Sequence, residues 1–121
     1  MAYSKLKFKK IIFLITNPYY LLIFLQHNVV PSIEHISCLR NLKIDTVYDV
    51  GANRGQFSLL CKYLYDEVKI ISFEPLTKPF KTYSKVFKNS SNVKSYQIAL
   101  GAKQRGKKKF MLPSRMIRHH Y

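Results

Sequence analysis

Two carboxylates and a glycine-containing turn are the residues of this chain whose types and spacing could do chemistry. Asp49 stands just before Gly51, and Gly55 closes the short sequence G-A-N-R-G. Glu74 follows about 20 residues downstream, which is the distance at which nucleotide-binding folds place a ribose-binding carboxylate. The spacing therefore indicates a site for a ligand that contains a nucleoside.

A strand and a helix must hold this turn. Residues 46–50 are β-branched or aromatic apart from Asp49, which is typical of a buried strand, and the run ends at Gly51. Beyond Gly55, apolar residues recur at three- and four-residue spacing and predict a helix; they are Phe57, Leu60, Cys61 and Leu64. A strand, a tight turn and a helix in this order place a ligand at the carboxyl end of the strand.

The chain repeats this alternation after the first helix. Residues 68–73 predict a second strand that ends at Glu74, residues 93–100 predict a third, and residues 107–112 are expected to begin a fourth. Between the second and third strands we expect a helix from Thr77, with an apolar face made of Phe80, Tyr83, Val86 and Phe87. Alternating strands and helices predict an α/β fold with parallel pairing, as in the first half of a Rossmann-like sheet.

The N-terminal residues 1–30 predict a basic, apolar and helical segment. Asn17-Pro18 interrupts its apolar run, which is shorter than the ~20 residues that span a bilayer, and no small-residue cleavage site follows. We therefore expect a cytoplasmic protein, with a helix that begins near Pro18. Residues 1–25 either pack on the domain or a partner, or make peripheral contact with an anionic membrane. A second helix is expected from Pro31-Ser32, with Ser32 as its N-cap and an apolar face of Ile36, Leu39 and Leu42.

The charge of the chain is strongly positive, with 21 Lys and Arg against 6 Asp and Glu in 121 residues, a net charge of +15. Such a balance is consistent with an anionic partner, but solvated lysine faces are the simpler interpretation. No aromatic residues interleave with the lysines outside core positions, so nucleic acid is not favoured. Cys38 and Cys61 lack the spacing of a metal site, and we expect both to be reduced and buried.

The turn itself indicates which nucleoside the site selects. In the dinucleotide motif G-x-G-x-x-G the middle glycine contacts a pyrophosphate, but here Asn53 occupies that position, and the P-loop G-K-S/T is absent. S-adenosylmethionine carries no phosphate. Asp49 could pair with its ammonium, the N–H groups of the turn with its carboxylate, and Glu74 with its ribose hydroxyls. A dinucleotide is the less favoured alternative.

Four segments together resemble the FkbM family of S-adenosylmethionine-dependent methyltransferases. They are V-Y-D-V-G-A-N-R-G-Q-F-S at 47–58, I-S-F-E-P-L at 71–76, N-V at 92–93 and A-L-G at 99–101. The resemblance covers residues 31–112 and implies the first half of a class I methyltransferase fold, with S-adenosyl-L-methionine as cofactor. It implies a cofactor site made of Asp49, Gly51, Ala52, Asn53, Gly55, Glu74, Pro75, Ala99 and Leu100.

The resemblance also implies an activity, which is transfer of a methyl group to a hydroxyl of a sugar or natural product. It assigns no catalytic residue and no metal. The family continues beyond this chain, so we interpret residues 113–121 as an out-of-frame tail of a truncated product, with a natural variable end as the alternative. A truncated sheet exposes an unpaired strand edge, and we therefore expect marginal stability and self-association.

Two rival functions remain open from the sequence. The first is a non-enzymatic remnant that binds membranes or polyanions through residues 1–25 and 103–118, where basic residues gather. The second, less favoured, is an RNA methyltransferase, which the charge supports but for which no RNA-binding module is present.

Overall fold

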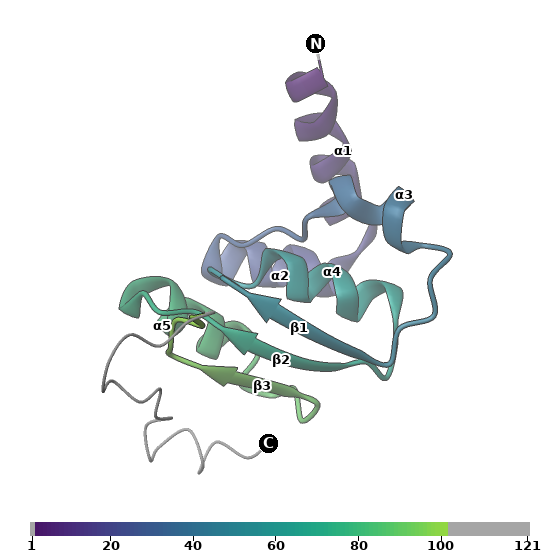
Figure 1. The fold of residues 1–121 in the computed structure, drawn as a ribbon. Coiled ribbons are helices and arrows are strands. Elements are labelled where there is room, and N and C mark those ends of the chain that lie inside the picture. The colour runs from purple at the N-terminus through teal and green to yellow at the C-terminus, as the bar shows by residue number, and fades with distance from the viewer. Residues whose placement is uncertain (1, 102–121) are drawn as a thin grey trace, which may run out of the picture.

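The computed structural model describes residues 2–101, and these form helices packed against a three-stranded sheet (Figure 1). All strand pairs are parallel, and the strand order is β1-β2-β3. The predicted alternation of strands and helices is therefore confirmed as a mixed α/β fold, compatible with half of a Rossmann-like sheet. Its elements are β1 Thr46–Val50, α4 Gln56–Leu64, β2 Lys69–Phe73, α5 Thr77–Val86 and β3 Val93–Tyr96.

The N-terminal segment forms two helices that meet at a sharp bend. The break falls at Asn17, whose side-chain amide donates to the carbonyl of Phe13 at 2.7 Å, and Pro18 begins the second helix as predicted. That helix ends at a left-handed Asn28, whose N–H donates to the carbonyl of Phe24 at 2.7 Å. These helices are α1 Ala2–Thr16 and α2 Pro18–His27.

The bend between these helices matters for the question of whether they could cross a membrane. Within residues 2–101, no single helix is long and apolar enough to cross a bilayer. Only α1 and α2 taken together are long and apolar enough to cross, and the two helices are bent by 113° relative to each other.

The segment before β1 differs from its prediction. Residues from Ile33 form a single 3-10 turn, η1 Ile33–His35, and a four-residue helix, α3 Ile36–Leu39. Ser32 makes no side-chain cap, and Leu42 lies outside the helix with 51% of its surface exposed. The expected N-cap and the expected length of this helix are therefore wrong. The backbone N–H of Ser32 instead donates to the carbonyl of Gln56 at 3.1 Å, which holds the segment against the start of α4.

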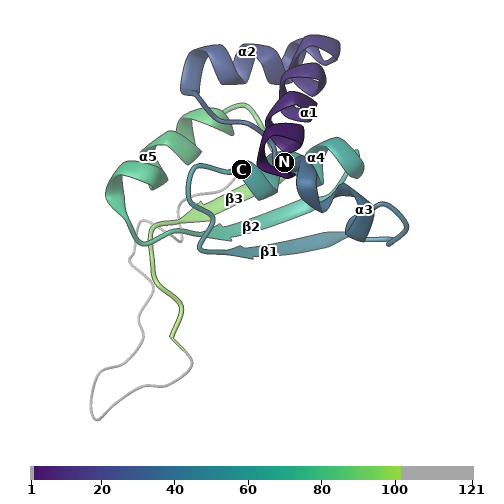
Figure 2. The same cartoon turned by 90° about the horizontal axis from the view of Figure 1, so that it is seen from above.

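The helices α1, α2, α4 and α5 lie on one face of the sheet (Figure 2). In the strands, alternate side chains point toward them, so Val47 and Asp49 of β1 are buried opposite Ile70 and Ser72 of β2. The described core is apolar side chains from both layers: Phe13, Leu14, Tyr20, Ile23, Val29, Val47, Ala52, Leu59, Cys61, Val68, Ile70, Tyr83, Val86, Phe87 and Val93. Helix α5 buries the expected apolar side, Tyr83 and Val86, and exposes its lysines.

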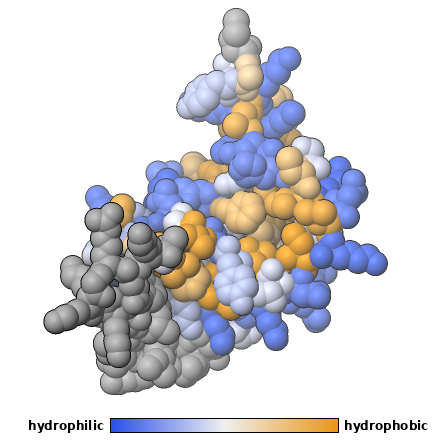
Figure 3. All heavy atoms as spheres, in the orientation of Figure 1, coloured by the Kyte–Doolittle hydropathy of each residue, from blue (hydrophilic) through white to orange (hydrophobic). Residues whose placement is uncertain are grey.

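The opposite face of the sheet, which we call the uncovered face, carries no helix from residues 2–101. It presents Tyr48 and Val50 of β1, exposed at 67% and 59%, and the stacked rings of Phe73 and Tyr96, 5.7 Å apart. Figure 3 shows apolar side chains gathered on this side of the molecule. Parallel sheets normally bury both faces, so this surface is one that such a fold would cover.

Three further expectations have different outcomes. Strand β3 is shorter than predicted, because the chain leaves the sheet after Tyr96. Cys61 is buried as expected, but Cys38 is exposed, because the short α3 does not pack that side chain inward. The predicted fourth strand at 107–112 and the tail at 113–121 lie outside the described residues.

The uncovered face predicts self-association. Replacing Tyr48 and Val50 together by lysine should reduce it, because both side chains are exposed and like charges repel across an interface. Sedimentation velocity should show a shift toward smaller species with little change in thermal stability. Association that persists unchanged in the double variant would show that another surface is responsible.

Candidate functional site

The glycine turn, residues 51–55, joins β1 to α4 and needs three left-handed residues. The φ angles of Gly51, Asn53 and Gly55 are 74°, 53° and 101°. Such angles suit glycine and are tolerated by asparagine, which explains the residue types at these positions. The N–H groups of Gly51 and Ala52 both donate to the carbonyl of Phe73, at 2.8 and 3.0 Å. The turn is thereby fixed to the end of β2, where Glu74 follows.

Glu74 links the turn to both neighbouring strands. Its Oε1 accepts the N–H of Asn53 and its Oε2 that of Leu76, each at 2.8 Å. Its own N–H donates to the carbonyl of Tyr96 at 3.1 Å, so β3 holds it from the other side. The residue is only 6% exposed. Each carboxylate oxygen keeps a further lone pair, so the group can accept additional hydrogen bonds from hydroxyls.

Asp49 lies beneath the turn in a buried polar network. The Oγ of Ser58 on α4 donates to its Oδ2 at 2.7 Å. Ser58 Oγ also lies 3.2 Å from the Oγ of Ser72 and accepts the hydroxyl of Tyr83 at 3.0 Å. The network joins β1, α4, β2 and α5 across the core, and it leaves no described buried polar side-chain atom without a partner.

Three members of this network were not predicted as site residues. Ser58 and Ser72 stand in the sequence only as parts of motifs, and Tyr83 only as an apolar position of its helix. A signal was available, because a buried tyrosine hydroxyl needs a hydrogen-bond partner. The alternation of β2 also places Ser72 on the same face as Ile70, toward the helices.

Burial and neighbouring charge set the electrostatics of the site. Burial raises the pKa of the Asp49 carboxyl, the hydrogen bond from Ser58 opposes this, and the charge of Glu74 raises the pKa further. Asp49 also helps burial to raise the pKa of the Cys61 thiol, to about 12, so this cysteine is no nucleophile. The two predicted carboxylates thus lie near enough to interact, at the carboxyl edge of adjacent strands. This edge favours a cationic ligand.

The two glycines of the turn face different surroundings. A Cβ added at Gly51 would meet nothing within 4 Å, so this side of the turn is open. A Cβ at Gly55 would lie 2.5 Å from the ring of Phe87 and 3.1 Å from that of Tyr83. Gly55 therefore permits α4 to pack against α5, whereas Gly51 leaves space at the edge where a ligand would approach.

The backbone N–H groups of the turn and Pro75, which were predicted to contact the cofactor, are not available in the way expected. The N–H groups of Gly51, Ala52, Asn53 and Gly55 all donate within the protein, so they are not free to receive a ligand carboxylate in this conformation. Pro75 is exposed, and its carbonyl accepts the side-chain amide of Gln97 at 3.4 Å.

The segment after β3 holds the last two predicted site residues. Ala99 and Leu100 are exposed there, where the chain turns toward the uncovered face (Figure 2). The structure therefore brings Asp49, Glu74 and the glycine turn together, while these two residues lie outside that cluster.

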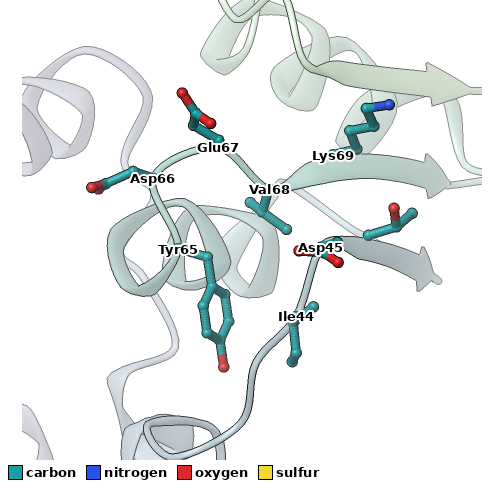
Figure 4. Close-up of a pocket in the computed structure, with 8 residues that line it drawn as sticks. Ile44, Asp45, Tyr65, Asp66, Glu67, Val68 and Lys69 are labelled. Atoms are coloured by element: carbon teal, nitrogen blue, oxygen red, sulfur yellow. The ribbon is translucent and has the colours of Figure 1, made fainter.

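A separate hollow of about 650 Å³ lies at the opposite, amino edge of β1 and β2. Figure 4 shows the side chains of Asp66 and Glu67 pointing away from each other and from Asp45. No group of three metal-binding side chains occurs among residues 2–101. Acids that do not converge form no metal centre, so this hollow adds nothing to the site.

Comparison with protein-family models gave no match, and comparisons with curated proteins and with solved structures found no similar chain. The family resemblance therefore depends on the motif residues themselves.

The two glycines should respond differently to alanine. Gly55→Ala should lower the free energy of unfolding by about 3 kcal/mol or more, because it combines a strained φ with a clash against Phe87. Gly51→Ala should cost only the backbone strain, about 1–2 kcal/mol, because its Cβ has open space. Urea denaturation measures both. Equal losses would show that the contact with Phe87 is not what constrains Gly55.

Asp49→Asn should make the protein more stable at pH 7. A carboxyl whose pKa is raised on folding binds its proton more tightly in the folded state. Stability present at low pH is therefore lost as pH rises from the ordinary pKa, 3.8, through the folded value. Asparagine avoids this loss and still accepts the hydrogen bond from Ser58.

Thermal unfolding at several pH values tests this expectation. The advantage of Asp49→Asn should disappear below pH 3.8, where the carboxyl is protonated in both states. Asp45→Asn, on the exposed residue just before the same strand, is the matched control and should change stability little. A destabilised Asp49→Asn variant at pH 7 would contradict the assigned cost of the buried charge.

Proposed function

We propose that residues 31–101 form the cofactor-binding part of an S-adenosylmethionine-dependent methyltransferase resembling the FkbM family. The observation that carries the proposal is Glu74, a carboxylate fixed at the end of β2 by two backbone N–H groups. It follows a glycine turn whose outer side is open at Gly51. A fixed acceptor next to an open turn is the arrangement that recognises a ribose in nucleotide-binding folds.

Charge favours a sulfonium nucleoside over a dinucleotide at this edge. Asp49 and Glu74 are close enough for their charges to interact, and their combined potential would repel a pyrophosphate. S-adenosylmethionine instead brings a sulfonium and an ammonium, which this potential attracts. Asn53, in the left-handed conformation, further replaces the glycine that lets a pyrophosphate approach the backbone.

The residues present fit such a cofactor in part. Glu74 has lone pairs left for the two ribose hydroxyls, and the space beside Gly51 admits the ligand. Asp49 is 8% exposed and acts as a negative charge below the turn. The carboxylate of the cofactor would need donors other than the four N–H groups that are already engaged.

When bound, the cofactor would supply an electrophilic methyl group. The oxygen of an acceptor hydroxyl would bond to the methyl carbon, S-adenosylhomocysteine would leave as a neutral thioether, and the hydroxyl proton would pass to solvent or to a base. The protein contributes by holding the two reactants in register, which can supply a large part of the rate enhancement. The hydrogen bonds from the turn to the carbonyl of Phe73 and to Glu74 would hold the cofactor side of the site in place. The acceptor class we propose is a hydroxyl of a sugar or natural product, and no described residue is assigned as the base.

Isothermal titration calorimetry with S-adenosylmethionine, and with NAD as comparison ligand, tests the proposal. The wild-type chain should bind S-adenosylmethionine and not NAD. Glu74→Gln should weaken binding by about tenfold or more, because a hydrogen bond to a charged group contributes roughly 1.5–3 kcal/mol. Gly51→Ala should also weaken it, because its Cβ enters the space beside the turn.

Glu67→Gln is the matched control, since it changes the same residue type at the opposite edge of the sheet. It should leave the affinity unchanged, and circular dichroism should show that each variant remains folded. Absence of binding by folded wild-type protein would refute the proposal, as would equal affinities of wild type, Glu74→Gln and Gly51→Ala.

A further inference from the structure

A basic groove lies between α2, α4 and α5, away from the glycine turn. It measures about 500 Å³, and its charged lining comes from three lysines, Lys62, Lys85 and Lys88, with His27 beside them. Among its described lining residues there is no carboxylate. We call it the lysine groove. Three cations gathered in a concave site without an acid produce a local positive potential that favours an anion.

Lys62 is the cation of the groove whose ammonium is held by neighbouring side chains. Its Nζ donates to Ser90 Oγ at 2.7 Å and lies 6.0 and 5.9 Å from the ring centres of Tyr19 and Phe87. Burial lowers the pKa of this ammonium, and within residues 2–101 it forms no ion pair. A partly desolvated ammonium held in place by a hydroxyl and two rings would gain most from an anionic partner.

The groove opens beside exposed apolar side chains of α2. Tyr19 and Leu22 both line it and are each 51% exposed, and Leu25 on the same helix is 70% exposed. This combination of a basic hollow with an apolar rim is uncommon on a water-facing surface.

Helix α1 presents a second apolar surface. At 3.6 residues per turn, its outward stripe is Phe8, Ile11, Ile12 and Ile15, which are exposed at 62%, 49%, 45% and 66%. Lys5 and Lys9 lie along one border of this stripe and Lys7 along the other. Long basic side chains on both borders can reach lipid phosphates while the stripe enters the acyl boundary.

We propose that the α1 stripe and the outward side of α2 dock on an anionic lipid bilayer, with a lipid headgroup phosphate in the lysine groove. Charge complementarity selects this occupant, because lysines border each apolar surface and line the groove. A nucleic acid would use the lysines but would leave the exposed isoleucines in water. A second copy of the chain would bring like charges together. The inference does not depend on cofactor binding.

Vesicle co-sedimentation of the full chain tests the proposal. Vesicles of phosphatidylcholine with 30% phosphatidylglycerol are compared with phosphatidylcholine alone, and binding should be at least tenfold tighter to the anionic vesicles. The double variant Lys85→Gln with Lys88→Gln should weaken it by about tenfold or more, since each lysine near an anionic surface contributes roughly 1 kcal/mol. Phe8→Ser with Ile15→Ser should weaken binding to a similar extent.

Two matched controls separate specific docking from general effects. Lys78→Gln with Lys81→Gln removes the same charge from exposed positions of α5 outside the groove, and should change binding less than threefold. Tyr48→Ser removes an exposed apolar residue from the uncovered face and should have no effect.

The same assays can overturn the proposal. Equal loss in both lysine pairs would show that the groove is not the headgroup site. The docking surface would be refuted if the protein did not bind anionic vesicles. It would also be refuted if RNA competed for binding and the double variant Phe8→Ser with Ile15→Ser bound RNA as well as the wild type. A dimer of the wild type that dissociates in this double variant would refute it too.

Discussion

The carboxylate of Glu74 is the contact on which the described architecture depends most. Its two oxygens hold the N–H groups of Asn53 and Leu76, and its backbone is bonded to Tyr96 of β3. One residue therefore connects the turn after β1, the loop after β2 and the end of β3. Because hydrogen bonds to a buried charge are stronger than neutral ones, this edge of the sheet is fixed before any ligand arrives. A preorganised acceptor loses little entropy on binding.

Asp49, in contrast to Glu74, lowers the stability of the fold, because its charge is buried. Its pKa is raised by burial and by Glu74, and only the hydrogen bond from Ser58 opposes this. A second buried carboxylate placed beside Glu74 does not help a small domain to fold, but the pair creates a potential suited to a cation. Neighbouring buried charges that cost stability are characteristic of functional sites. The network through Ser58, Ser72 and Tyr83 shows how the core accommodates the charge without leaving a polar group unpaired.

The N-terminal helices are connected to the same turn. The guanidinium of Arg54 donates to the carbonyl of Asn28 at the end of α2, at 3.0 Å, and Ser32 donates to Gln56 at the start of α4. A surface that docks through α1 and α2 would thus belong to the same packed unit as the turn, although it lies away from the turn itself. The proposed methyltransferase and the proposed membrane contact are compatible, because a membrane-bound enzyme meets acceptors that are held at the same surface.

The sequence by itself determined the local structure. Apolar periodicity located β1, α4, β2 and α5, Pro18 located the start of α2, and the spacing of Asp49, Gly51 and Glu74 placed two acids at strand ends. These features depend on short-range backbone and side-chain preferences. It misjudged the helix after Ser32 and the length of β3, where weak local signals yield to packing.

Only the tertiary structure decided which atoms meet. The bonds of Glu74 to the turn, the clash that forbids a side chain at Gly55, and the lysine groove all join residues distant in sequence. No local pattern encodes such distances. They arise when strands and helices pack together, which is why the sequence could name the acids but not the network that holds them.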